Sequence, residues 1–160
     1  MSRTTHKGSS ASQKTLRRIF VWTFAVMVFT GFGQMPIFKR YYLADVPGLD
    51  WTADFYLTHY IHYVGAMLLL GLIAYGIIDY LLSGRKRLSL TRSAYVRIAL
   101  LSGIVFTGVL RVMKNLPDVL FAPGFTQFID LSHLGFMMLY LFVAGFCLAF
   151  RSGWVVAKSH

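Results

Sequence analysis

The chain has 160 residues, of which 56% are hydrophobic and only 14% are charged, and its mean hydropathy of +0.59 is too high for a soluble domain of this size. Its net charge of +10 would suit a nucleic-acid-binding protein, but the basic residues flank long uncharged stretches instead of gathering on one polar face, which argues against nucleic acid as a partner. The single Cys excludes a disulfide framework, a Cys-rich zinc site and a cysteine-held iron–sulfur cluster within this chain.

A helix needs about 20 apolar residues to cross the hydrocarbon core of a bilayer, and four segments are candidates. After a basic arm at residues 1–15, which we expect to be disordered, the spans are predicted at about 19–38, 55–80, 95–114 and 127–150. The third is the weakest, because only Ile98 to Leu110 lies between Arg97 and Arg111. It spans if these bases snorkel toward the interfaces; a buried soluble helix is the alternative. The sequence thus predicts an all-α integral membrane protein, with a four-helix bundle at residues 16–152 and a short tail at 153–160.

The basic residues are distributed unevenly between the two sides of this bundle. Five Lys and Arg precede the first span, five lie between the second and third, and two follow the fourth, whereas the other two loops hold four. Because cytoplasmic loops carry an excess of Lys and Arg, both termini are predicted to be cytoplasmic. A cleavable signal peptide is the alternative for the first span, but its apolar run is too long and no A-x-A site follows.

Three of the five His fall within the predicted spans, where ionisable side chains are rare and usually functional. His62 lies roughly 10 Å below the outer end of the second helix, and His133 is comparable if the fourth helix begins near Thr126. Two imidazoles at one level can hold the iron of haem b from opposite faces. His59 is the alternative to His62, since the two are about 60° apart on the helix and cannot both point at one iron. Otherwise His59 would bond a propionate or a quinone.

Neighbouring residues suit a flat cofactor. Gly65 and Gly135 follow the two histidines closely and would let a ring approach the backbone. Arg111 and Lys114, at the outer end of the third span, are placed to pair with haem propionates. One alternative stays open from spacing alone, in which the histidines only hydrogen-bond across helices and hold no metal.

Four helices with both termini inside and His on spans two and four resemble the membrane cytochrome b subunits of formate dehydrogenase and nickel–iron hydrogenase, a cytochrome b561-like di-haem family. The likeness covers roughly residues 15 to 152. It is clearest in the first span, where Arg18, Trp22 and then Thr30 to Phe32 follow the family's Arg-x-x-His-Trp … Thr-Gly-Phe opening. The resemblance implies that His62 and His133 ligate a haem near the outer face.

The family's second, inner haem takes two further His, and Val21 and Cys147 stand at those positions. We therefore expect one haem b, with Cys147 a small core residue. The loss also puts the family's quinone site in doubt, because that site lies beside the inner haem. Residues that could line an outer quinone site, although first of all they suit an interfacial belt, are Tyr41, Tyr42, Tyr56, Tyr60 and Tyr63.

The resemblance implies an electron-transfer subunit of a respiratory oxidoreductase complex in the bacterial inner membrane rather than a stand-alone enzyme. It would pass electrons between the quinone pool and a periplasmic redox subunit, either an iron–sulfur or a multihaem protein. A further membrane subunit would be needed for electrons to cross the whole bilayer. The alternative function is a haem-free membrane anchor or assembly subunit of a redox complex.

Overall fold

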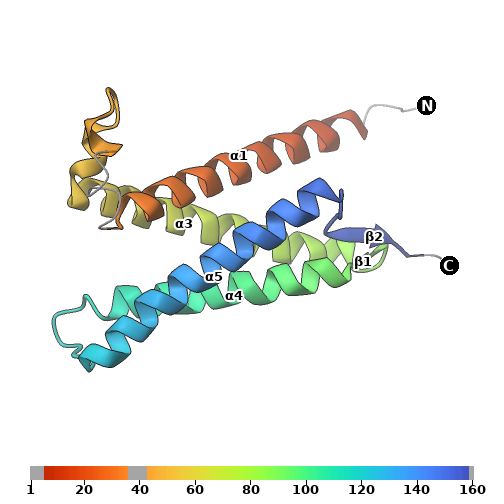
Figure 1. Ribbon diagram of the computed structural model, residues 1–160. Coiled ribbons are helices and arrows are strands. Elements are labelled where there is room, and N and C mark those ends of the chain that lie inside the picture. The colour runs from red at the N-terminus through yellow and green to blue at the C-terminus, as the bar shows by residue number, and fades with distance from the viewer. Residues whose placement is uncertain (1–5, 36–42, 159–160) are drawn as a thin grey trace. The chain divides into compact units, whose positions relative to one another are not determined.

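The computed structural model describes residues 6–35 and 43–158, with side chains from Lys14 to Met35 and from Ala44 to Lys158. It is mostly helical, and four of its helices are long and apolar enough to cross a membrane, as the sequence predicted (Figure 1). They are α1 (His6–Gly33), α3 (Phe55–Asp79), α4 (Arg92–Met113) and α5 (Pro123–Ala149).

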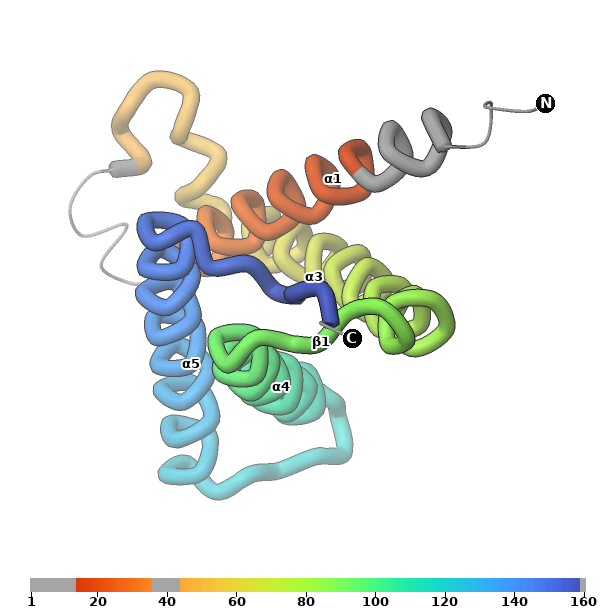
Figure 2. The backbone as a smooth tube through the Cα atoms, turned by 90° about the vertical axis from the view of Figure 1, so that its right-hand side faces the viewer, coloured from red at the N-terminus to blue at the C-terminus, as the bar shows by residue number. Residues whose placement is uncertain are grey.

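The chain divides into two compact units, Met1–Leu82 and Ser83–His160. In each unit two long helices pack side by side, α1 with α3 and α4 with α5 (Figures 1 and 2). We call these pairs the first and the second hairpin, and we call the end of each pair at which its two helices are connected the loop end. Two short 3-10 turns, Leu43–Asp45 and Asp50–Ala53, lie in the connection of the first hairpin.

Local sequence explains where three of the helices begin. The first N–H groups of a helix lack partners within the helix, and a side-chain oxygen just before it supplies one. Asp54 Oδ1 accepts hydrogen bonds from the backbone N–H of Tyr56 at 2.9 Å and of Leu57, so α3 starts at Phe55. Thr91 Oγ1 accepts from Ala94 N at 3.1 Å at the start of α4. The first turn of α5 holds Pro123, which needs no hydrogen-bond acceptor there.

The opposite end of the second hairpin is closed by a small antiparallel sheet, with β1 (Leu88–Leu90) paired to β2 (Val155–Ala157). Before β1, α3 runs on into a π-helical turn at Tyr80–Gly84. The Arg97 guanidinium is buried, donates to Gly153 O at 2.9 Å and stacks 4.1 Å from the Trp154 ring centroid. Arg97 therefore holds the segment after α5 against the start of α4, and its snorkelling toward an interface stays a prediction.

Several helix boundaries differ from the expected ones. Helix α1 begins at His6, so residues 6–15 are helical where a disordered arm was expected, and it ends at Gly33. Helix α5 begins at Pro123, about one turn earlier than Thr126, because Pro fits the first helical turn. The loop bases Lys39 and Arg40 lie outside the described residues.

The helices of each hairpin meet through small and hydroxyl residues, as membrane helices commonly do. Thr30 and Thr58 in the first hairpin and Thr107 in the second are all buried. A Cβ placed on Gly103 would lie 2.9 Å from Cε1 of Phe136, so the Phe136 ring lies directly against the α4 backbone. Hydroxyl groups and glycines at the contact let the backbones approach closely, and most large apolar side chains of the helices face outward.

Candidate functional site

The first hairpin holds His62 of α3 against a Thr-Gly pair on α1. Thr30 Oγ1 lies 2.9 Å from His62 Nδ1, and a Cβ on Gly31 would lie 3.4 Å from His62 Cε1. The Thr30 hydroxyl also donates to Val26 O at 2.8 Å, one helical turn back. A hydroxyl has one proton, so with that proton on Val26 O the hydroxyl oxygen accepts the Nδ1–H of His62.

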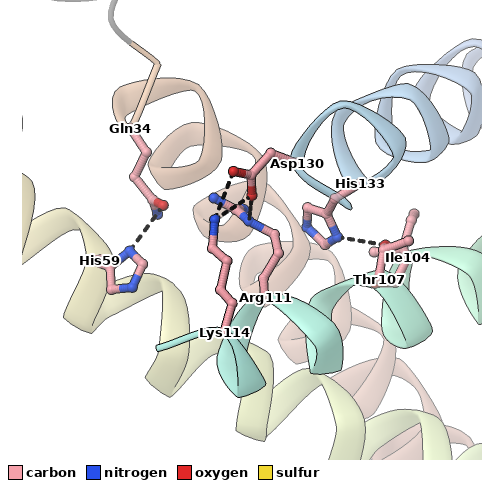
Figure 3. Close-up of polar contacts among 8 residues, drawn as sticks. All are labelled: Gln34, His59, Ile104, Thr107, Arg111, Lys114, Asp130 and His133. Carbon is pink, nitrogen blue, oxygen red and sulfur yellow. Dashed lines mark hydrogen bonds and ion pairs between the residues drawn. The ribbon is translucent and has the colours of Figure 1, made fainter. Parts of the chain in front are cut away.

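The second hairpin holds His133 of α5 in the same way (Figure 3). Thr107 Oγ1 lies 2.9 Å from His133 Nδ1 and donates to Gly103 O at 2.7 Å. A Cβ on Gly108 would again lie 3.4 Å from Cε1 of the histidine. With this assignment of the threonine proton, a neutral ring carries its own proton on Nδ1 in both hairpins, and Nε2 then has the lone pair through which a metal is bound.

A second polar pair lies one turn nearer the loop end of each hairpin (Figure 3). In the first, His59 Nδ1 donates to Gln34 Oε1 at 3.1 Å. In the second, Asp130 pairs with Arg111 Nε at 2.9 Å and with Lys114 Nζ at 2.7 Å. The structure thus brings the two predicted propionate-binding bases together around one carboxylate, that of Asp130, which the sequence had not singled out.

The side-chain amide of Gln34, just after the end of α1, has a donor that makes no hydrogen bond. Its Nε2 is buried and has no hydrogen-bond partner. A buried amide donor without an acceptor costs about 1–3 kcal/mol, so an oxygen acceptor placed here would be bound favourably. Gln34 had not been predicted as a site residue, and it lies one turn from the His62 level.

His59 lies in an aromatic cluster on its own helix. Its ring centroid is 5.2 Å from that of Phe55 and 4.3 Å from that of Tyr63. Tyr60 lines a separate apolar groove of about 440 Å³ between α1 and α3, together with Trp22. Tyr56 is exposed, as is Tyr60. The remaining candidates for lining a quinone site, Tyr41 and Tyr42, lie outside the described residues.

The two glycines expected to face a cofactor have different surroundings. A Cβ on Gly65 would lie 2.7 Å from Met27 Sδ, so Met27 of α1 packs on this glycine. Around Gly135 there is open space within 4 Å of the corresponding position. The approach of a ring to either glycine stays a prediction. Cys147 is buried in α5, as expected of a core residue.

Sequence reasoning singled out both histidines but missed the two threonines that contact them. The signal was present, because the tetrapeptide Val-Phe-Thr-Gly occurs at residues 28–31 and again at 105–108.

Within residues 6–35 and 43–158, no three His, Cys, Asp or Glu side chains gather as a multi-ligand metal ion site requires. No family model matches the chain, and neither a curated protein nor a solved structure does.

Proposed function

We propose that this chain is a b-type cytochrome, in which His62 and His133 are the axial ligands of one haem b. One observation carries the proposal. Each hairpin presents one imidazole within a candidate membrane span, and each imidazole lies with its Nδ1 2.9 Å from a threonine hydroxyl. A six-coordinate haem iron takes two such rings through Nε2, and a partner at Nδ1 is what orients histidine ligands in metal sites.

Two polar features near the histidines suit the carboxylates of a haem. The buried Nε2 of Gln34 is a donor that a propionate oxygen would satisfy. Around Asp130, two cations share one carboxylate, which leaves one positive charge for a second anion to balance. Arg111 and Lys114 are therefore proposed to bind a propionate alongside Asp130.

The haem would supply one-electron redox chemistry, and the chain would supply ligation, orientation and an apolar surrounding. We propose that the protein is an electron-transfer subunit of a respiratory complex in the bacterial inner membrane. Its partners would be a periplasmic iron–sulfur or multihaem subunit and the quinone pool, with a further membrane subunit where electrons cross the bilayer. Tyr56, Tyr60 and Tyr63 remain the described candidates for a quinone contact.

A haem-free membrane anchor is the second candidate, and one observation favours it too. Both histidines form hydrogen bonds between helices, which by themselves stabilise a helix pair by about 0.6 kcal/mol in a membrane. An anchor would need these bonds and no metal. The two candidates differ in whether Nε2 is used, and this can be measured directly.

The test is a dithionite-reduced minus oxidised spectrum of the detergent-purified protein, with pyridine haemochrome quantitation. We expect about one haem b per chain. His133→Ala and His62→Ala should each abolish haem retention, whereas the matched change His59→Ala on the same helix should largely preserve it. Full haem content in purified His133→Ala, or no haem in folded wild-type protein, would refute the proposal.

If His59→Ala loses haem and His62→Ala keeps it, the ligand is His59 instead. This outcome would leave the cytochrome proposal standing but would move the iron one turn toward the loop end. The geometry favours His62, because only there does a Thr-Gly pair match the one that holds His133.

A further inference from the structure

The two hairpins repeat one structural unit. Residues 28–31 of α1 and 105–108 of α4 have the same sequence, Val-Phe-Thr-Gly. In both, the threonine meets a histidine of the following long helix at 2.9 Å, and the glycine meets the Cε1 edge of the same ring at 3.4 Å. The match extends one turn further, because the polar pairs Gln34–His59 and Arg111–Asp130 occupy equivalent positions, four residues after the threonine and three before the histidine.

The contacts one turn before and one turn after the histidines differ in chemistry between the hairpins, whereas the contacts of the histidines do not. The polar pair nearer the loop end is uncharged in the first hairpin and an ion pair in the second. One turn farther from the loop end, a glycine contacts a bulky side chain of the partner helix, but the two residues are on opposite helices in the two hairpins. Gly65 of α3 contacts Met27 of α1, whereas Gly103 of α4 contacts Phe136 of α5. Of these three successive contacts, the one between the Thr-Gly pair and histidine is the one that is the same in both hairpins. This indicates that the two histidines have the same role.

The proton arrangement of the threonines points to that task. Each hydroxyl donates to a backbone carbonyl four residues earlier, at 2.8 Å in α1 and 2.7 Å in α4. Each hydroxyl oxygen is then an acceptor for Nδ1–H. A flip of the ring would break this bond, and a change of tautomer would cost either this bond or the bond from the threonine to the backbone carbonyl. The glycine beside the threonine leaves space for the ring edge, so the plane of the imidazole is fixed as well.

We propose that Thr30 and Thr107 are equivalent positioning residues, which select the Nδ1–H tautomer of His62 and His133 and thereby set iron affinity and redox potential. This inference rests on the proposed haem function. An acceptor at Nδ1 makes the imidazole a stronger donor at Nε2, which favours ferric over ferrous iron. Removing either acceptor should therefore weaken haem binding and raise the midpoint potential.

The experiment compares Thr30→Val and Thr107→Val, which keep the side-chain shape and remove the hydroxyl, in the full chain. Thr58→Val is the matched control, because Thr58 is equally buried and its hydroxyl bonds the backbone of its own helix. We expect each test variant to bind haem about 10- to 100-fold more weakly. A tenfold selective loss for the ferric form raises the midpoint potential by about 59 mV.

Thr30→Ser and Thr107→Ser keep an acceptor, so their haem affinity and midpoint potential should be near those of the wild type. The control Thr58→Val should also leave both quantities near wild type. An unchanged potential and affinity in both Val variants, with haem present in the wild type, would overturn the positioning role and leave the cytochrome proposal intact. A wild-type protein without haem would overturn both.

A second measurement determines the tautomer directly in the wild-type protein. Histidine-¹⁵N NMR of the haem-free wild-type protein reports which ring nitrogen carries the proton. We expect Nδ1–H for His62 and His133, with the signals assigned by His62→Gln and His133→Gln. Protonation at Nε2 in either ring would overturn the proposed role of its threonine.

Discussion

Gly103 offers a sharp test of how closely the helices of the second hairpin pack. An added Cβ at this position would lie 2.9 Å from Cε1 and 3.0 Å from Cδ1 of Phe136. Optimal carbon–carbon contacts are about 3.5–4.0 Å, so Gly103→Ala forces a displacement of roughly 0.6–1.0 Å. A flat ring cannot yield at one edge alone, and α4 and α5 must move apart or the ring must leave its rotamer.

Overpacking of this kind costs about 1–3 kcal/mol, whereas replacing Gly by Ala within a helix gains up to about 1 kcal/mol. We expect Gly103→Ala to lower the free energy of unfolding by up to about 2 kcal/mol. Gly145→Ala on α5 is the matched control, since nothing lies within 4 Å of its added Cβ. The control gains the helix propensity without the clash, so the two alanines should shift stability in opposite directions.

The assay is reversible unfolding in mixed detergent micelles, followed by circular dichroism, of both variants and the wild type. Gly65→Ala is an informative third variant, because the atom it meets is the flexible end of Met27 at 2.7 Å. Its cost should be smaller than that of Gly103→Ala, although the initial distance is shorter. If Gly103→Ala is as stable as Gly145→Ala, the reasoning about a rigid ring against the α4 backbone is refuted.

Two further predictions concern the polar contacts at the ends of the second hairpin. Asp130→Asn removes the carboxylate shared by Arg111 and Lys114, and it should destabilise the protein by about 1 kcal/mol, with the difference from wild type shrinking in high salt; equal differences at low and high salt would contradict an ionic contribution. Arg97→Lys keeps the charge but loses the guanidinium that bonds Gly153 and lies over Trp154, and limited proteolysis should then cleave after α5 faster than in the wild type. Cleavage at the wild-type rate would show that Arg97 does not hold this segment.

The helices were predictable because each depends on a property of one segment alone. A run of apolar residues long enough to cross a bilayer shows in the sequence without knowledge of its neighbours, and all four runs are helices. The start of α5 was placed one turn late, because an apolar run marks where hydrocarbon begins and Pro123 permits a helix to begin earlier.

The histidines were predictable for the same reason, since an ionisable side chain inside an apolar run is unusual by itself. Their partners were not, because a contact between helices depends on the register of two segments. Asp130 and Arg111 are 19 residues apart, and Thr30 and His62 are 32 apart, so neither pair shows in a single-helix pattern. The repeated Val-Phe-Thr-Gly segment was the sequence feature that pointed to this contact in both hairpins.

The depth of the two histidines illustrates why this register matters more than helix length. His62 lies seven residues after Phe55, the start of α3, whereas His133 lies ten residues after Pro123, the start of α5. Counted from the helix ends, their depths differ by about 4.5 Å.

The partner helices show the same offset. Thr30 lies three residues before Gly33, the end of α1, and Thr107 lies six before Met113, the end of α4. Both helices of the second hairpin therefore extend one further turn past the histidine level, and the contact between threonine and histidine is unaffected. It follows that the register of paired helices, rather than distance from a helix end, fixes the position of each imidazole. Changes to the threonines should therefore affect the site, whereas changes in the first turn of α5 should affect it little.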